Sequence, residues 1–268
     1  MPATIDWHRP WLAPLLPQLP FVTERDCSGD WRAAFDVAAA ERGLCNHRGD
    51  RLRFVEQSDL PAGLAYEAFI SATGGVPTRT NLHDFFNALV WLTYPGAKAA
   101  LNAIQASEIV RLAQPLTSGT AVGGTRGTLR DRATIFDENA ALLLSCDPAL
   151  EQALRDHQWQ EALLERRAAF GIACEVRLFG HALMEKLTNP YMAITAHVWV
   201  LEVAPDFFRL QEPEKRICID ALLGKRLQQG LLTTVSTPLP VLGVPGWWQG
   251  QDAAFYAQTS VFRPKRTA

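Results

Sequence analysis

The chain has 268 residues, of which 48% are hydrophobic and 20% are charged, and its formal net charge is −2. This balance is typical of a soluble globular protein and argues against a disordered chain or one that coats nucleic acid. The five cysteines form no CxxC pair, and the sequence contains neither an apolar signal segment nor an apolar run of membrane length. We therefore expect a soluble protein of the reducing cytoplasm that does not enter a membrane.

Taken in chain order, the patterns of apolar residues predict more helix than strand. Helices are predicted at residues 31–42, 81–92, 97–112, 147–170, 178–187 and 212–229. Strands are predicted at residues 51–56, 140–144, 172–177 and 194–203, and residues 66–73 fit either structure. We expect an α+β fold that is predominantly helical, with a small sheet, in a single globular domain over residues 1–268.

The segments between these elements carry turn and loop signals. Residues 1–27 are expected to form a short helix and an arm, and Ser28-Gly29-Asp30 is expected to cap the first long helix. The sequence Gly74-Gly75-Val76-Pro77 predicts a turn, and the glycine-rich residues 114–128 predict a mobile surface loop. From Leu231 onward, proline and glycine predict a long irregular C-terminal tail of extended segments.

The predicted helix over residues 81–92 makes two conflicting demands. Its apolar side chains cover most of its circumference, so it must be buried almost all round. Yet His83, Asp84 and Asn87 form a polar stripe across its first two turns, with Thr80 or Asn81 as the N-cap. A buried stripe needs partners, which can be other polar side chains, water, a metal or a ligand.

Three other segments offer such partners. Asp137-Glu138-Asn139 places two carboxylates and an amide in a predicted turn before a buried strand, His181 and Glu185 share a helix face, and His197 lies in the strongest predicted strand. Each also has a simpler interpretation: a plain turn, a helix-surface pair and a core histidine bonded to a carbonyl. Together these residues predict a polar site.

The first functional hypothesis is a metal-dependent hydrolase of unknown substrate. His83, His181, Glu185 and Asp137 are residue types that hold a divalent Zn, Mn or Mg ion through nitrogen and oxygen. A bound metal would activate water, and a remaining carboxylate would act as general base. In this hypothesis the catalytic candidates are Glu138, Asp84 and Asn87.

The ligand-binding candidates are Arg79, Arg130 and Trp247. A third, weaker hypothesis is a protein that binds a nucleotide or phosphate ester through Arg79, Arg126 and Arg130, although these arginines can equally pair with carboxylates of the chain. The main alternative to an enzyme is a non-catalytic binding or regulatory module. Its polar cluster would be a structural hydrogen-bond network, and the Trp247-Trp248 region would be its contact surface for a partner or small molecule.

Several of these segments resemble a bacterial protein family catalogued only as domain of unknown function number 3025. The resemblance covers nearly the whole chain and is carried by residues 83–91, Lys98, Leu101, Asn102, residues 136–139, residues 179–186 and residues 239–247. The sequence departs from the family pattern at Ala140, where we associate a glycine with the family. The resemblance implies a Gram-negative bacterial origin and no accepted activity.

Overall fold

The computed structural model describes residues 5–19, 31–113 and 128–265. With 54% helix and 14% strand, the fold is α+β and predominantly helical, as predicted. None of the helices in the described ranges is long and apolar enough to cross a membrane. The predicted caps at residues 28–30, and all of the loop predicted at 114–128 except its last residue, lie outside these ranges.

The chain divides into two compact units, each built from separate stretches of sequence. Unit 1 consists of the described parts of Leu15–Asp137 together with Arg216–Thr234. Unit 2 consists of Ile5–Pro14, Glu138–Lys215 and the described part of Val235–Ala268. The single domain expected from the sequence stays a prediction.

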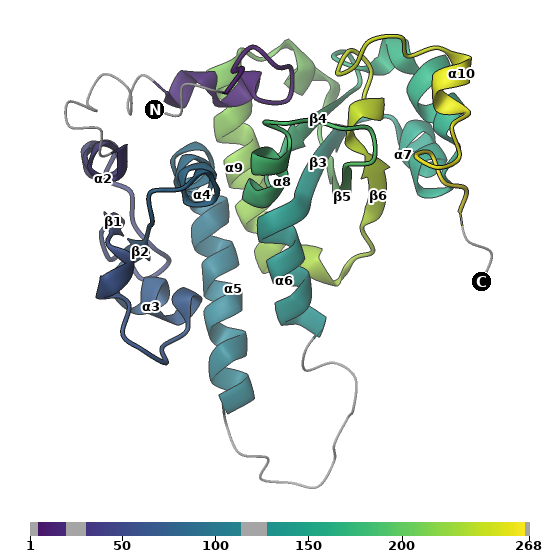
Figure 1. The fold of residues 1–268 in the computed structure, drawn as a ribbon. Helices are drawn as coiled ribbons and strands as arrows, with labels where there is room; N and C mark the ends of the chain where they lie inside the picture. Colours follow the sequence, from purple (N-terminus) through teal and green to yellow (C-terminus); the bar gives the residue numbers. More distant parts are fainter. Residues whose placement is uncertain (1–4, 20–30, 114–127, 266–268) are drawn as a thin grey trace, which may run out of the picture. The chain divides into compact units, whose positions relative to one another are not determined.

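Unit 1 is mainly helical (Figure 1). Its elements are most of η1 (Ala13–Gln18), α2 (Trp31–Glu41), β1 (Arg53–Val55), η2 (Gln57–Asp59), α3 (Tyr66–Thr73), β2 (Gly75–Pro77), α4 (Leu82–Thr93), α5 (Pro95–Ala113), most of α6 (Thr128–Asn139) and of α9 (Glu212–Gln228), and η6 (Leu231–Thr233). Helix α3 packs on α5, and α2 packs on α4 and β1.

Helix α4 is the buried element of unit 1 that its apolar pattern predicts. Every residue from Asp84 to Thr93 is buried. Phe85 makes edge-on ring contacts with Trp31 and Phe35 of α2, with centroids 5.3 and 5.4 Å apart. The Asn81 side chain accepts the Asp84 amide at 2.8 Å, which confirms Asn81 as the N-cap.

Unit 2 is organised around a four-stranded sheet of order β4-β3-β5-β6 (Figure 1). Its elements are β3 (Ala140–Ser145), α7 (Pro148–Arg155), π-helix η3 (Gln160–Glu165), η4 (Arg167–Ala169), β4 (Cys174–Leu178), α8 (His181–Lys186), β5 (Thr195–Glu202), η5 (Pro205–Arg209), β6 (Thr237–Pro240), η7 (Val241–Gly243) and α10 (Ala253–Tyr256). Strand β3 is buried throughout and pairs parallel with β5 and antiparallel with β4. Such a fully covered central strand explains its unbroken apolar run.

The C-terminal tail is less irregular than predicted, because β6 joins the sheet antiparallel to β5. Pro238 and Pro240 lack the amide hydrogen that a ladder requires, so a strand containing both is tolerated at a sheet edge. The backbone amide of Val241, the residue after Pro240, donates to the carbonyl of Ile194. The backbone amides that alternate with the prolines therefore face β5. Two prolines at the remaining positions protect the outer edge from pairing with another strand.

Three local predictions are wrong. Residues Gly75–Pro77 form β2, paired parallel with β1, where a turn was expected over residues 74–77. The segment Asp137-Glu138-Asn139 is the last turn of α6, which passes directly into β3. The helix expected over residues 147–170 ends at Arg155, because His157 adopts a left-handed backbone with φ of 56°.

Candidate functional site

Four polar side chains of unit 1 meet beside α4 and are called here the Lys98 cluster: Tyr66, Asn87, Lys98 and Asp137. The Lys98 ammonium donates to Asn87 Oδ1 at 2.9 Å and to Asp137 Oδ1 at 2.5 Å. Asn87 Nδ2 in turn donates to the Tyr66 hydroxyl at 2.9 Å. The amide orientation follows from Lys98, which can only donate and therefore requires the Asn87 oxygen.

Each member of the Lys98 cluster comes from a different helix. Tyr66 begins α3, Asn87 lies in the second turn of α4, Lys98 lies in the first turn of α5, and Asp137 lies near the end of α6. The Lys98 side chain is only 4% exposed, and its ammonium sits 5.3 Å from the centre of the Trp91 ring. A lysine this buried is tolerable because a carboxylate, an amide oxygen and an aromatic face surround its charge.

Asp84, a predicted catalytic residue, is engaged by Arg79, a predicted ligand-binding residue. The Asp84 carboxylate accepts the Arg79 backbone amide at 2.6 Å, its Nε at 3.0 Å and its NH2 group at 3.1 Å. These hydrogen bonds raise the pKa of Arg79, chiefly through Asp84. The pairing fixes the chain entering α4 and satisfies a buried carboxylate.

The Tyr66 hydroxyl is kept in its neutral form. Burial raises the pKa of Tyr66 well above its usual value, and the nearby charges of Asp137 and Asp84 raise it further. The hydroxyl therefore keeps its proton at neutral pH while it accepts the hydrogen bond from Asn87. Tyr66 and Asp137 belong to one electrostatic environment, although they lie 71 positions apart by their numbering.

Sequence reasoning identified Asn87 and Asp137 as site residues but missed Tyr66 and Lys98. A signal for Lys98 was present, because it falls among Ala97, Ala100 and Leu101 on the buried face of α5. A charged residue on a buried helix face needs a partner, just as the stripe of α4 does. Tyr66 carried no comparable signal, since its segment fitted helix and strand equally.

The other predicted site residues are placed without forming a recognisable centre. His83 lies half-buried on α4 in unit 1, and Arg130 is exposed on α6. In unit 2, Glu138 is exposed, Glu185 is half-buried and His181 is buried at the start of α8. Among the residues that the structure describes, no three His, Cys, Asp or Glu side chains form a group that could hold a metal ion. The predicted metal centre thus gains no support, and the individual roles stay predictions.

His197 lies on β5 within unit 2, with its Nδ1 3.3 Å from the Ser236 hydroxyl. Burial lowers the pKa of His197 below its ordinary value of 6.5. As the pH falls, His197 is therefore protonated at a higher pH in the unfolded chain than in the folded protein. The side chain is half-buried and its contact is a hydroxyl, where the core-histidine interpretation expected a backbone carbonyl.

We expect the free energy of unfolding to be fully maintained above about pH 6.5 and to decrease as the pH falls below it. Replacing His197 with Gln should flatten that decrease. An NMR titration of the imidazole, assigned with the His197→Gln variant, should give a midpoint below 6.5. A midpoint at or above 6.5 would contradict the assignment of this pH dependence to His197.

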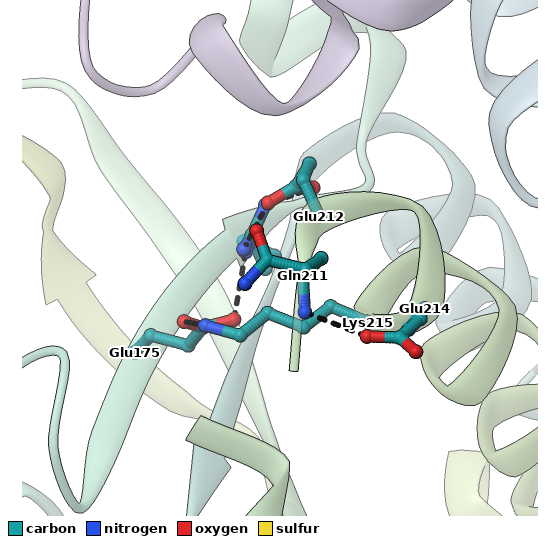
Figure 2. Close-up of polar contacts among 6 residues, drawn as sticks. Glu175, Gln211, Glu212, Glu214 and Lys215 are labelled. Carbon is teal, nitrogen blue, oxygen red and sulfur yellow. Dashed lines mark hydrogen bonds and ion pairs between the residues drawn. The ribbon is translucent and has the colours of Figure 1, made fainter. Parts of the chain in front are cut away.

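A second polar group, in unit 2, links β4 to the start of α9. Arg177 is buried, with its Nε donating to Glu175 at 2.9 Å and its two terminal nitrogens donating to Glu212 at 2.7 and 2.8 Å. Lys215 donates to the other Glu175 oxygen at 2.8 Å, as Figure 2 shows. With two cations and two carboxylates, the group is neutral, so its charges are mutually satisfied.

The sequence at the start of α9 favours this arrangement. Glu212 and Glu214 lie in the first turn, where carboxylates interact favourably with the helix dipole. The Glu214 carboxylate accepts the backbone amide of Gln211 at 2.9 Å, which is visible in Figure 2 and satisfies an otherwise unpaired donor. Glu212 is thereby positioned to accept two parallel hydrogen bonds from Arg177.

Trp247 borders a pocket of about 390 Å³ whose wall includes this charged group. Arg177 and Glu212 line one side, while Phe170, Pro245 and Trp247 supply apolar surface. The Trp247 ring packs against Trp11, with centroids 5.9 Å apart, which holds it at the rim. The lining is therefore mixed, with charged side chains beside apolar ones, and it would match a small molecule that carries both polar and apolar groups.

Comparison with known proteins gives a family without an activity. A family model described as a protein of unknown function (DUF3025) matches residues 52–266. No curated protein and no solved structure matches the chain.

Proposed function

We propose a function from the chemistry of the site alone, because this chain belongs to DUF3025, a family of proteins of unknown function. The proposed function is that of a non-catalytic binding or regulatory module. In it the Lys98 cluster is a structural hydrogen-bond network, and the pocket beside Trp247 is the contact surface.

The observation that carries this proposal is the position of the Lys98 ammonium. It lies against Asn87 Oδ1 and Asp137 Oδ1, the oxygens that a metal or a substrate would need to reach. Asp84, the other carboxylate of the stripe, is held by Arg79. Asn87 and Asp84 of the α4 stripe thus have protein partners, which is the arrangement expected of a buried structural network.

The pocket beside Trp247 supports the binding part of the proposal. Arg177 and Glu212 hold each other through two parallel hydrogen bonds, so the polar wall of the pocket is rigid before anything binds. A preformed site with an aromatic rim lowers the entropy cost of capturing a ligand. The metal-dependent hydrolase remains the competing function, because it makes the opposite prediction for Asp137.

Replacing Asp137 with Asn distinguishes the two functions by melting temperature, measured with and without EDTA and with added zinc, manganese or magnesium. For a structural network we expect wild-type melting to be insensitive to EDTA and to each metal. The variant should melt several degrees lower in every condition, because a charge-assisted bond contributing about 1.5–3 kcal/mol is lost. Protein purified without a metal-affinity tag should contain far less than one metal ion per chain.

The matched control is Asp206→Asn, which removes a carboxylate from an exposed pair with Arg209 and should leave the melting temperature unchanged. The hydrolase would be supported, and the structural network rejected, if EDTA lowered the wild-type melting temperature and Asp137→Asn abolished that sensitivity.

A further inference from the structure

A larger cavity of unit 2 lies between the residues following α7, strands β5 and β6, and the segment 260–265. Its volume is about 600 Å³, which is in the range of sites for small organic ligands. It shares no lining residue with the pocket beside Trp247 and contains no member of the Lys98 cluster. A ligand in this cavity would therefore contact none of the residues on which the proposed function rests.

The cavity has apolar walls with flat faces. Its apolar lining residues are Trp159, Ala193, Pro238, Pro240, Val261 and Pro264. Proline rings and an indole offer broad, rigid surfaces that lose little entropy when a flat apolar group packs on them. The hydroxyl groups of Thr195 and Ser260 interrupt this lining.

The lining is positively charged, since it includes Arg263 and Lys265 and no acidic residue. Lys265 is engaged by Asp156 at 2.7 Å, just outside the cavity. Among the residues that the structure describes, the Arg263 guanidinium makes one contact, of 3.4 Å from its Nε to the Ser260 carbonyl. Within residues 5–19, 31–113 and 128–265, no carboxylate forms an ion pair with Arg263, which leaves its terminal nitrogens available to an anion.

Side-chain contacts hold the backbone of the segment that carries Arg263. Trp159 Nε1 donates to the Arg263 carbonyl at 2.8 Å, and His157 Nδ1 lies 3.1 Å from the same oxygen. The two rings pack with centroids 4.8 Å apart.

The backbone of His157 adopts an unusual conformation at the point where its side chain contacts the Arg263 segment. His157 follows the C-cap of α7 with φ of 56°, a position that glycine usually occupies. A side chain there carries strain of about 1 kcal/mol or more, which is offset here by what the imidazole holds. The strain in the His157 backbone is thus offset by a contact that holds the Arg263 segment beside the cavity.

We propose that this cavity is a binding site for a small aromatic carboxylic acid. The flat body of the ligand packs against Trp159 and the β6 prolines, and its carboxylate pairs with the Arg263 guanidinium. The apolar lining favours an organic acid over a free inorganic anion, because phosphate would leave those walls uncovered. The planar guanidinium matches a carboxylate through two parallel hydrogen bonds.

Isothermal titration with 2-naphthoate, 2-naphthylmethanol and inorganic phosphate tests this site on the full chain. We expect 2-naphthoate to bind with one site per chain and a Kd on the order of 0.1 mM, from its number of non-hydrogen atoms. The alcohol should bind at least about tenfold more weakly, and phosphate should show no saturable binding. Arg263→Gln should weaken 2-naphthoate binding at least about tenfold and leave the alcohol unaffected.

Two further variants separate the cavity from a surface ion pair. Thr195→Phe fills the cavity from a strand position that tolerates aromatic residues, keeps Arg263, and should abolish binding of the naphthoate. Arg209→Gln removes an arginine whose side chain is 85% exposed and outside the lining, and should change nothing. Melting temperatures verify that each variant is folded.

The proposal is overturned if 2-naphthoate shows no saturable binding at millimolar concentration. Equal affinity for the acid and the alcohol would also overturn it, as would undiminished binding to Thr195→Phe. Saturable binding of phosphate at the same concentrations would reject the organic-acid class.

Discussion

Replacing Lys98 with Met is expected to lower the free energy of unfolding by about 3–5 kcal/mol, as measured by urea denaturation. The side chains have similar length, so the change removes the charge while keeping most of the volume. It leaves the Asp137 carboxylate and Asn87 Oδ1 without the ammonium that they share. It also removes the cation from the Trp91 ring.

The double variant Lys98→Met with Asp137→Leu should recover part of this loss. Replacing both partners of a buried ion pair by apolar groups leaves no uncompensated charge, so the two substitutions should not be additive. The recovered fraction measures the coupling between Lys98 and Asp137 directly.

Lys225→Met is the matched control, because Lys225 is an exposed residue of α9. It should change the free energy of unfolding by no more than about 0.5 kcal/mol. A Lys98→Met protein as stable as the wild type would show that the Lys98 cluster does not hold unit 1 together, and would reject its structural role.

Replacing Gly180 with Ala is the second substitution for which we expect a large effect, a loss of more than about 3 kcal/mol. A Cβ at this position would lie 2.5 Å from three backbone atoms: the amide nitrogens of Asn139 and Ala140 and the carbonyl oxygen of Glu138. Backbone atoms cannot rotate aside as a side chain can. Gly180, two residues after the end of β4, would therefore have to move away from the α6–β3 junction.

The loss of stability should be concentrated around the hydrogen bonds that the Gly180 backbone makes. The amides of Phe179 and Gly180 both donate to the Ala140 carbonyl, at 3.0 and 2.9 Å, and Gly180 is the N-cap of α8. Hydrogen exchange should accordingly show faster exchange in α8 and at the start of β3, together with a lower melting temperature.

Gly224→Ala is the control for this prediction. The nearest atom to its added Cβ is 3.5 Å away, an ordinary contact, and Gly224 lies within α9. The substitution should be neutral or stabilising by up to about 1 kcal/mol, because alanine favours the helix. A Gly180→Ala protein as stable as Gly224→Ala would refute the proposed close packing at the junction.

Periodicity in the sequence predicted α4 well, because a helix that is buried all round has apolar residues on most of its faces, and this pattern is visible in the sequence. The same holds for the Asn81 cap and for β3 and β5, whose bounds are within two residues of the predicted ones. It did not predict β2, because Gly75–Pro77 become a strand only when β1 lies alongside them. Nor did it predict that Asp137 lies in a helix, since the junction with β3 depends on the backbone of Gly180, 43 positions away by number.

The sequence by itself determined that the helix over residues 81–92 is buried and that its polar stripe requires partners. This follows from local chemistry, because an unpaired polar group in a protein interior is costly whatever surrounds it. Only the tertiary structure decided that those partners are Lys98, Tyr66 and Asp137 around Asn87, and Arg79 at Asp84. Residues on four helices were brought together by the burial of their apolar faces, and no local pattern records which polar side chains then meet.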